Sequence, residues 1–210
     1  MKQRKRRNRM FLKKLLGAAF ITAICMSGCT FLPQPKHYVE TASPTYDPAI
    51  AARIRILAAN GQQQATFTPG KDCYTPFPGK DSEKIIVNDG YFSAIKYSST
   101  SLTIGMPLSP RPWMRTDGLI FKDFIKEYVV AADKPLTVLI SSVGSAGNTY
   151  IYCTPPRMTF TPKPGRNYDI FMEHGNKQCW ISVRDIDEKG ADMPVAMKKA
   201  GKCSPSEMTN

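Results

Sequence analysis

The fold is decided by one stretch of the sequence, Ala52-Arg53-Ile54-Arg55-Ile56-Leu57, and by the Asn60-Gly61 pair that follows it. Apolar and polar residues alternate along the stretch, which is typical of a strand with one buried face. Asn-Gly between two extended runs favours a type I′ turn, in which both central residues need a positive φ. We therefore expect a β-hairpin whose second strand runs from Gln63 to Thr68.

Short apolar or β-branched runs continue downstream, separated by Gly, Pro and Asn. Further strands are predicted at 84–87, 91–97, 101–104, 126–130, 136–143, 149–153, 158–160, 168–173 and 179–186. The longest helical stretch that we expect is 121–127. Many short strands with turn residues between them indicate an all-β domain, an antiparallel β-sandwich over residues 50–210.

The charge of the chain is concentrated at its N-terminus. The formal net charge is +12, from 29 Lys and Arg residues and 17 Asp and Glu residues. Residues 1–28 hold eight of the basic residues and none of the acidic ones, so the remainder carries 21 minus 17, or +4. The remaining basic residues form no stripe that could neutralise a phosphate backbone, and we expect no nucleic-acid partner.

The N-terminal residues follow the order of a secretory signal peptide. A basic start precedes an apolar run over 15–24, and small residues follow it. The run has about a dozen residues, whereas a transmembrane helix needs roughly 20. We interpret residues 1–28 as a signal peptide, with Met10 as the alternative start to Met1.

The end of this leader, Met26-Ser27-Gly28-Cys29, resembles the lipobox of bacterial lipoproteins. The resemblance implies cleavage before Cys29 and lipid modification of that cysteine, and more than one acyl chain gives stable anchoring. Thr30, in place of Asp, favours the outer membrane, with the domain facing the periplasm or the cell surface. An ordinary signal peptide followed by a chance cysteine is the alternative.

Residues 29–49 contain four prolines and little periodicity. Proline-rich linkers favour extended polyproline conformations and act as semi-rigid spacers. We expect this segment to be a tether between the lipid and the domain.

Four cysteines remain after the leader and the lipid site: Cys73, Cys153, Cys179 and Cys203. The thiols of an exported chain are normally oxidised to disulfides, and four cysteines allow three pairings. Cys153 and Cys179 both lie on predicted strands, which favours that pair and leaves Cys73 with Cys203. A zinc site is the competing interpretation, but the spacing contains no short Cys-x-x-Cys element, and we expect no metal.

Two segments, 160–170 and 179–183, resemble a pattern of small exported β-sandwich lipoproteins of unknown function, with an immunoglobulin-like fold. The pattern has a Pro-Gly turn, a Tyr that opens the next strand and a Cys on its hairpin partner. Gly165 supplies the turn, and Tyr168 can bury its ring while its hydroxyl reaches a backbone partner at the sandwich corner. The resemblance implies no catalytic residues.

Residues that could serve catalysis are few. They are His37, His174, the run 141–145, the carboxylates Asp185, Asp187 and Glu188, and the loop 70–79. The run lacks the context of a nucleophile elbow, the carboxylates follow a predicted strand at its solvated end, and the loop lacks the Gly-Lys-Ser/Thr ending of a phosphate loop. We predict no catalytic residue, no cofactor and no enzymatic activity.

The longest irregular stretch, 106–121, contains three prolines. Long loops on rigid β scaffolds often carry function. Arg111, Trp113 and Met114 are of types enriched in protein interfaces and form the candidate interface. The alternative is that Trp113 folds back as a plug over one end of the sandwich.

These features together predict a lipid-anchored, non-enzymatic envelope protein. Its domain would bind another envelope protein as a structural or accessory component of an envelope or secretion assembly. A glycan- or peptidoglycan-binding module is the alternative, and it requires a shallow groove lined by exposed Tyr or Trp rings.

Overall fold

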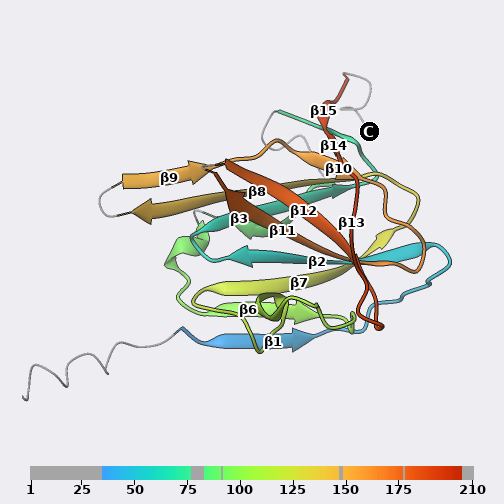
Figure 1. Cartoon of the computed structure of the whole chain (residues 1–210), viewed down its shortest axis with the longest axis horizontal. Coiled ribbons are helices and arrows are strands. Elements are labelled where there is room, and N and C mark those ends of the chain that lie inside the picture. The colour runs from blue at the N-terminus through green and yellow to red at the C-terminus, as the bar shows by residue number, and fades with distance from the viewer. Residues whose placement is uncertain (1–34, 77–82, 91, 147–148, 177, 205–210) are drawn as a thin grey trace, which may run out of the picture. The chain divides into compact units, whose positions relative to one another are not determined.

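A computed structural model describes residues 35–76, 83–90, 92–146, 149–176 and 178–204 (Figure 1). The chain is 52% strand and 4% helical, which confirms the predicted all-β class. The strands are β1 (His37–Thr41), β2 (Ala51–Ala59), β3 (Gln63–Pro69), β4 (Cys73–Tyr74), β5 (Ile85–Asp89), β6 (Ser99–Thr103), β7 (Asp123–Ala131), β8 (Leu136–Ala146), β9 (Thr149–Cys153), β10 (Met158–Phe160), β11 (Asn167–Gly175), β12 (Gln178–Ile186), β13 (Asp192–Pro194), β14 (Lys198–Lys199) and β15 (Gly201–Lys202). Two short 3-10 helices, η2 (Phe92–Ile95) and η3 (Pro112–Met114), interrupt them.

Thirteen strands form one mixed sheet that turns back on itself at β2 and β3. In the first half, β1, β6, β7 and β2 run side by side, and β11, β12 and β13 continue from β2 (Figure 1). In the second half, β5, β3, β8, β10 and β14 are neighbours, and β9 extends β8 as a hairpin. The fold is therefore sandwich-like, with two layers that belong to one hydrogen-bonded sheet.

The predicted β2–β3 hairpin is the corner between these layers. Its strands pair only at Ala59 and Gln63. The turn has three residues, closed by the Gln62 amide donating to the Ala59 carbonyl at 3.1 Å. Gly61 has a φ of +72°, but Asn60 keeps a negative φ, so the type I′ prediction is wrong. The two strands separate on leaving the turn because β2 belongs to one layer and β3 to the other.

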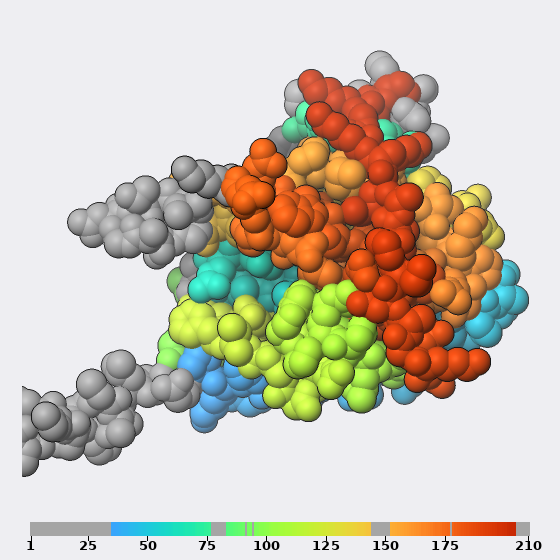
Figure 2. All heavy atoms as spheres, viewed as in Figure 1, coloured from blue at the N-terminus to red at the C-terminus, as the bar shows by residue number. Residues whose placement is uncertain are grey.

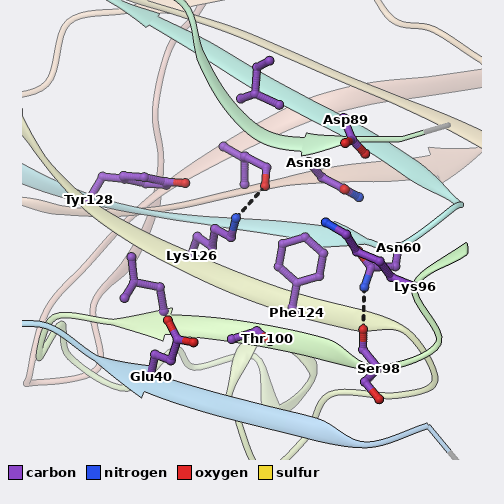
Figure 3. Close-up of a pocket in the computed structure, with 13 residues that line it drawn as sticks. Glu40, Asn60, Asn88, Asp89, Lys96, Ser98, Thr100, Phe124, Lys126 and Tyr128 are labelled. Atoms are coloured by element: carbon purple, nitrogen blue, oxygen red, sulfur yellow. Dashed lines mark hydrogen bonds between the residues drawn. The ribbon is translucent and has the colours of Figure 1, made fainter. Parts of the chain in front are cut away.

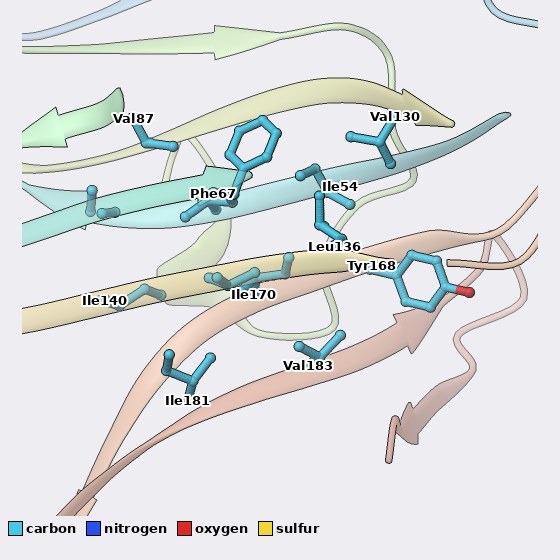
Figure 4. Packing of buried hydrophobic residues seen from close by; sticks show 14 of the residues in the cluster. Ile54, Phe67, Val87, Val130, Leu136, Ile140, Tyr168, Ile170, Ile181 and Val183 are labelled. Atoms are coloured by element: carbon cyan, nitrogen blue, oxygen red, sulfur yellow. The ribbon is translucent and has the colours of Figure 1, made fainter. Parts of the chain in front are cut away.

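The main core lies between the layers (Figure 4). Ile54 and Ile56 come from β2 and Ile170 comes from β11 in the first layer, opposite Phe67 of β3 and Ile140 of β8. Each of these side chains is at most 1% exposed. The apolar residues of the alternating stretch that predicted this strand thus form the inner face of β2.

The sheet is not purely antiparallel as predicted. β1 pairs with β6, β6 with β7, and β2 with β11, all in parallel. Each of these pairs joins segments separated by a long crossover, which turn signals between neighbouring strands cannot reveal.

The predicted tether over 29–49 and the domain start at residue 50 need correction. Residues His37–Thr41 form edge strand β1, and the His37 Nδ1 atom lies 2.7 Å from the Ser99 Oγ atom. The compact unit begins at Pro35. All five residues of β1 are exposed, so the strand shows no apolar alternation in the sequence.

Two local predictions are also wrong. Residues Phe92–Ile95 form η2 instead of a strand, while Tyr91 lies outside the described residues. The stretch 121–127 is not helical, because β7 begins at Asp123. Both faces of β7 are covered, one by the opposite layer and one by a loop. Its sequence therefore lacks the alternation of apolar and polar residues that marks a strand with one buried face.

Both favoured disulfides are confirmed. Cys73 is bonded to Cys203 and Cys153 to Cys179, with Cα–Cα distances of 4.8 and 6.2 Å. The first bond joins the short parallel pair of β4 and β15, which is separate from the large sheet. The C-terminal part of the domain is thereby linked to its N-terminal third.

The expected corner at Tyr168 is confirmed. Its ring is buried, and its hydroxyl oxygen accepts a hydrogen bond of 2.9 Å from the Lys163 amide. Gly165 has a φ of +71°, a conformation that glycine adopts at little cost.

The predicted signal peptide over 1–28 and the predicted lipid site at Cys29 lie outside the described residues. Within the described part of the chain, we find no helix with the length and apolar character needed to cross a membrane.

Candidate functional site

A strap formed by residues 104–118 covers the outer face of β7, β2 and β11. A buried charge cluster lies beneath it. The Arg55 guanidinium donates to Glu127 Oε1 at 2.8 Å and to Asp169 Oδ1 at 2.9 Å, and it also donates to the Pro107 carbonyl of the strap at 2.6 Å. Arg55, Glu127 and Asp169 are at most 3% exposed. One cation thus ties three strands and the strap together.

The second oxygens of the two carboxylates hold the strap directly. Glu127 Oε2 accepts hydrogen bonds from the amides of Ile104 at 2.7 Å and Met106 at 3.3 Å. Asp169 Oδ2 accepts a hydrogen bond of 2.5 Å from the Ser109 hydroxyl. Buried charges are stable when they are paired and hydrogen-bonded, and this cluster meets both conditions.

Arg111, the first residue of the predicted interface, extends the cluster towards the C-terminal segment. Its Nη2 atom lies 2.6 and 2.8 Å from the two carboxylate oxygens of Asp192. Its Nη1 atom lies 3.5 Å from Asp169 Oδ2. Burial raises the pKa of Asp169, and Arg55 and Arg111 partly offset that effect. Figure 2 shows the lime-coloured strap lying against the red segment that contains Asp192.

Trp113 and Met114, the other two predicted interface residues, are held on the sheet. Met114 is fully buried in a second core with Leu57, Ile125 and Phe171, so its assignment to an interface is wrong. Trp113 is 40% exposed, and its ring meets Phe171 edge-on with 5.0 Å between centroids. The ring folds back, as the alternative expected, but onto the outer face of the sheet and not over one end of the sandwich.

A second feature, which the sequence did not reveal, is a cavity between β5 on one side and β6 and β7 on the other (Figure 3). It has a volume of about 490 Å³, within the range of roughly 300–1,000 Å³ that ligand pockets occupy. Polar groups supply much of its wall. The lining residues are Glu40, Asn60, Ile86, Val87, Asn88, Asp89, Lys96, Ser98, Thr100, Leu102, Phe124, Lys126 and Tyr128.

Lys126 occupies the centre of the cavity, between two aromatic residues on the inner face of β7. Its ammonium donates to the Val87 carbonyl across the cavity at 2.9 Å and lies 5.5 Å from the centre of the Phe124 ring. Burial lowers the pKa of Lys126, and Lys96 lowers it further, whereas Glu40 and Asp89 raise it. Four charges, two of each sign, therefore surround the space.

Two asparagines fix the position of the cavity walls. Asn88 Nδ2 donates to the carbonyls of Ala59 at 2.9 Å and Gln63 at 2.6 Å, which holds β5 against the corner turn. Asn60 Nδ2 donates to the Ser98 carbonyl at 2.8 Å. The walls are thus held by hydrogen bonds to backbone atoms.

An apolar rim lies beyond the cavity, on η2, on the segment that joins η2 to β6, and on the turn before β7. Phe92 is 72% exposed, Ile95 90%, Tyr97 43% and Phe121 51%. Lys122 lies between two of these rings, 5.8 Å from the centre of Tyr97 and 5.9 Å from that of Phe121. We refer to Phe92, Ile95, Tyr97 and Phe121 as the apolar rim.

Asp123, next to the rim, makes stability depend on pH. Burial raises its pKa from 3.8 to about 6, partly offset by His37. A raised carboxyl pKa favours the folded state at low pH, and this contribution is lost as pH rises from about 4 through 6. We expect Asp123→Asn to remove that fall and to stabilise the protein at pH 7 by on the order of 1 kcal/mol, a value reduced for the solvent contact of the carboxyl. Denaturant unfolding between pH 4 and pH 8 measures the change, and parallel pH profiles for the two proteins would contradict it.

The residues considered for catalysis form no reactive constellation among those described. His174 Nε2 lies 3.3 Å from Ser142 Oγ, but no carboxylate of the described residues is hydrogen-bonded to His174. Asp185 accepts hydrogen bonds from Arg166 at 2.9 and 3.1 Å, and Asp187 accepts from backbone amides of its own turn. Within the described ranges, no three His, Cys, Asp or Glu side chains are grouped to hold a metal.

Comparison with known proteins adds no assignment, since no family model, curated protein or solved structure matches the chain. The function must therefore be argued from the site.

Sequence reasoning missed the cavity because its residues are scattered over β1, the corner turn, β5, β6 and β7. One signal was present. Lys126 lies between Phe124 and Tyr128 at the spacing of one strand face, and a lysine on an inward-facing apolar position is unusual.

Proposed function

We propose that this chain is a lipid-anchored envelope protein whose β domain binds another protein as a non-enzymatic accessory component of an envelope or secretion assembly. The observation that carries the proposal is the apolar rim. Four large side chains, from η2, from the segment between η2 and β6, and from the turn before β7, are between 43% and 90% exposed. Contiguous exposed apolar groups rimmed by polar residues are typical of protein-binding surfaces.

The composition of the rim supports a protein partner. Aromatic residues dominate the energetics of protein interfaces, and the rim contains three of them. Lys122, beside Tyr97 and Phe121, supplies a cation at the border of the patch. The strap residues make a smaller contribution, because Arg111 and Met114 are already engaged within the domain.

The proposed lipid anchor at Cys29, in the outer membrane and facing the periplasm, is supported by the lipobox-like sequence and by the two disulfides, which suit an oxidising compartment. Labelled fatty acid should enter the full-length protein in growing cells, and Cys29→Ser should abolish the labelling. Persistent labelling of the Cys29→Ser variant would refute the anchor.

The partner is tested by photo-crosslinking in intact cells. A crosslinking amino acid at Ile95 should give one discrete product of higher mass, because Ile95 is the most exposed residue of the rim. The same amino acid at Lys198, which forms a surface ion pair with Asp72, should give none. A Phe92→Ala/Phe121→Ala variant, crosslinked from Ile95, should lose the product while retaining its melting temperature. Equal products from positions 95 and 198 would argue against a specific partner.

An immunoglobulin-like relationship is part of this proposal. It is supported by the hydroxyl of Tyr168 at the sandwich corner and by the disulfide between Cys153 and Cys179.

The glycan- or peptidoglycan-binding alternative ranks second. It calls for exposed Tyr or Trp rings along a shallow groove. Both tryptophan rings are partly exposed, Trp113 at 40% and Trp180 at 45%, but Trp113 packs edge-on against Phe171 and Trp180 donates its indole N–H to Glu173. If the protein were retained on purified cell-wall material, and substitutions in the apolar rim did not change that retention, glycan binding would rank above protein binding.

A further inference from the structure

The cavity beside Lys126 is polar where a sandwich interior is normally apolar. Lys126 projects from the inner face of β7, which elsewhere contributes Phe124 and Val130 to the main core. Side chains of both signs and several amides line the same space, which is larger than two other hollows of about 140 and 180 Å³. Such a wall is stable only when solvent or a polar ligand fills the space.

Two groups inside the cavity have unused hydrogen-bonding capacity. A lysine ammonium has three donors, and the structure gives Lys126 one acceptor, the Val87 carbonyl at 2.9 Å. Asp89, from the opposite wall, has its Oδ1 atom buried without a hydrogen-bond partner among the described residues. A ligand that completes the site therefore needs an acceptor for Lys126 and a donor for Asp89.

The charge balance narrows the class of ligand. The cavity carries two basic side chains, Lys96 and Lys126, and two acidic ones, Glu40 and Asp89. A simple anion would meet the two carboxylates, and a simple cation would meet the two ammonium groups. A neutral sugar would offer hydrogen bonds but no opposite charge to Lys126 or Asp89, and buried charges are stabilised mainly by opposite charges and by hydrogen bonds to them.

We propose that this cavity binds a small zwitterion of amino-acid or dipeptide size, with its carboxylate on Lys126 and its ammonium on Asp89. Leu102 and Phe124 offer apolar contact to the rest of the ligand. Lys96 and Glu40, both exposed, lie at the borders of the cavity and form a second pair of opposite charges. Binding of a zwitterion in this cavity would be a second function, in addition to protein binding at the apolar rim.

The probe is L-alanyl-L-alanine, titrated into the full-length protein in detergent and followed by amide shifts in NMR spectra. Binding in the millimolar range or tighter should shift amides of β5 and β7. The N-acetyl derivative lacks the ammonium and the C-terminal amide lacks the carboxylate, so each should bind at least about tenfold more weakly. N-acetylglucosamine, a neutral sugar, should not compete.

Matched variants test the two contacts. Lys126→Met keeps the length of the side chain and should weaken dipeptide binding at least about tenfold. Asp89→Asn keeps its shape and should do the same, which secures the test if Lys126→Met fails to fold. Lys198→Met removes a surface ion pair with Asp72 and should leave the affinity unchanged.

Three results would overturn the proposal: no shift with the dipeptide, equal binding of the acetylated or amidated dipeptide, or unchanged affinity in both Lys126→Met and Asp89→Asn. Preferential binding of N-acetylglucosamine would instead assign the cavity to a sugar. None of these outcomes affects crosslinking from Ile95, so the two proposals fail separately.

Discussion

Arg55→Met is expected to lower the free energy of unfolding by about 3–5 kcal/mol. The substitution preserves most of the side-chain volume but removes the cation between Glu127 and Asp169, both of which are at most 2% exposed. Two buried carboxylates would then be left without their main counter-ion. Removing one partner of a buried ion pair is costly for this reason, even where the complete pair contributes little net stability.

Denaturant unfolding of Arg55→Met, with Arg166→Met as the matched control, measures the effect. Arg166 also pairs with an aspartate, Asp185, but it is 45% exposed, and its loss should cost at most about 1 kcal/mol. Neutralising both carboxylates in Arg55→Met/Glu127→Gln/Asp169→Asn should recover part of the loss. Equal stability of Arg55→Met and Arg166→Met would show that the cluster is not an energetic centre of the fold.

Removing the disulfide between Cys73 and Cys203 should cost about 5 kcal/mol, whereas removing the one between Cys153 and Cys179 should cost about 3.5 kcal/mol. The difference arises in the unfolded chain. The first bond closes a loop with a sequence separation of 130 residues and the second one of 26 residues, so the first restricts the unfolded ensemble more.

The double variants Cys73→Ser/Cys203→Ser and Cys153→Ser/Cys179→Ser, unfolded under identical conditions, provide the comparison. A loss of about 5 kcal/mol is large against the 5–15 kcal/mol that stabilise a typical domain, so the first variant should be partly unfolded near body temperature. The opposite order of stabilities would mean that native packing, and not the entropy of the unfolded chain, sets the contribution of these bonds.

The sequence predicted those parts of the fold that depend on local patterns. Ala52 to Leu57 alternate because only one face of β2 meets the main core, and the strands at 149–153 and 158–160 have the predicted bounds. The pattern failed where burial does not follow a period of two. β1 is exposed on every residue, whereas β7 is covered on both faces, by the opposite layer and by the strap.

The site was less predictable than the fold. Loop composition pointed to Arg111, Trp113 and Met114, but the attraction of Arg111 to Asp169 and Asp192 holds the loop down as a strap. Those partners lie more than 50 residues away along the chain, and no local signal joins them. The cavity was missed for the same reason, since its walls meet only after the sheet has turned at β2 and β3.

The parallel pairing of β2 with β11 has a consequence for the order in which the domain folds during synthesis. Arg53 lies opposite Asn167 in this register, so one of the earliest strands has a neighbour that emerges more than 100 residues later. Pairings between such distant segments fold slowly, because the chain between them must first be closed into a loop. Truncated chains that end before Asn167 should therefore remain protease-sensitive, and the whole domain should fold only after its last third has been synthesised.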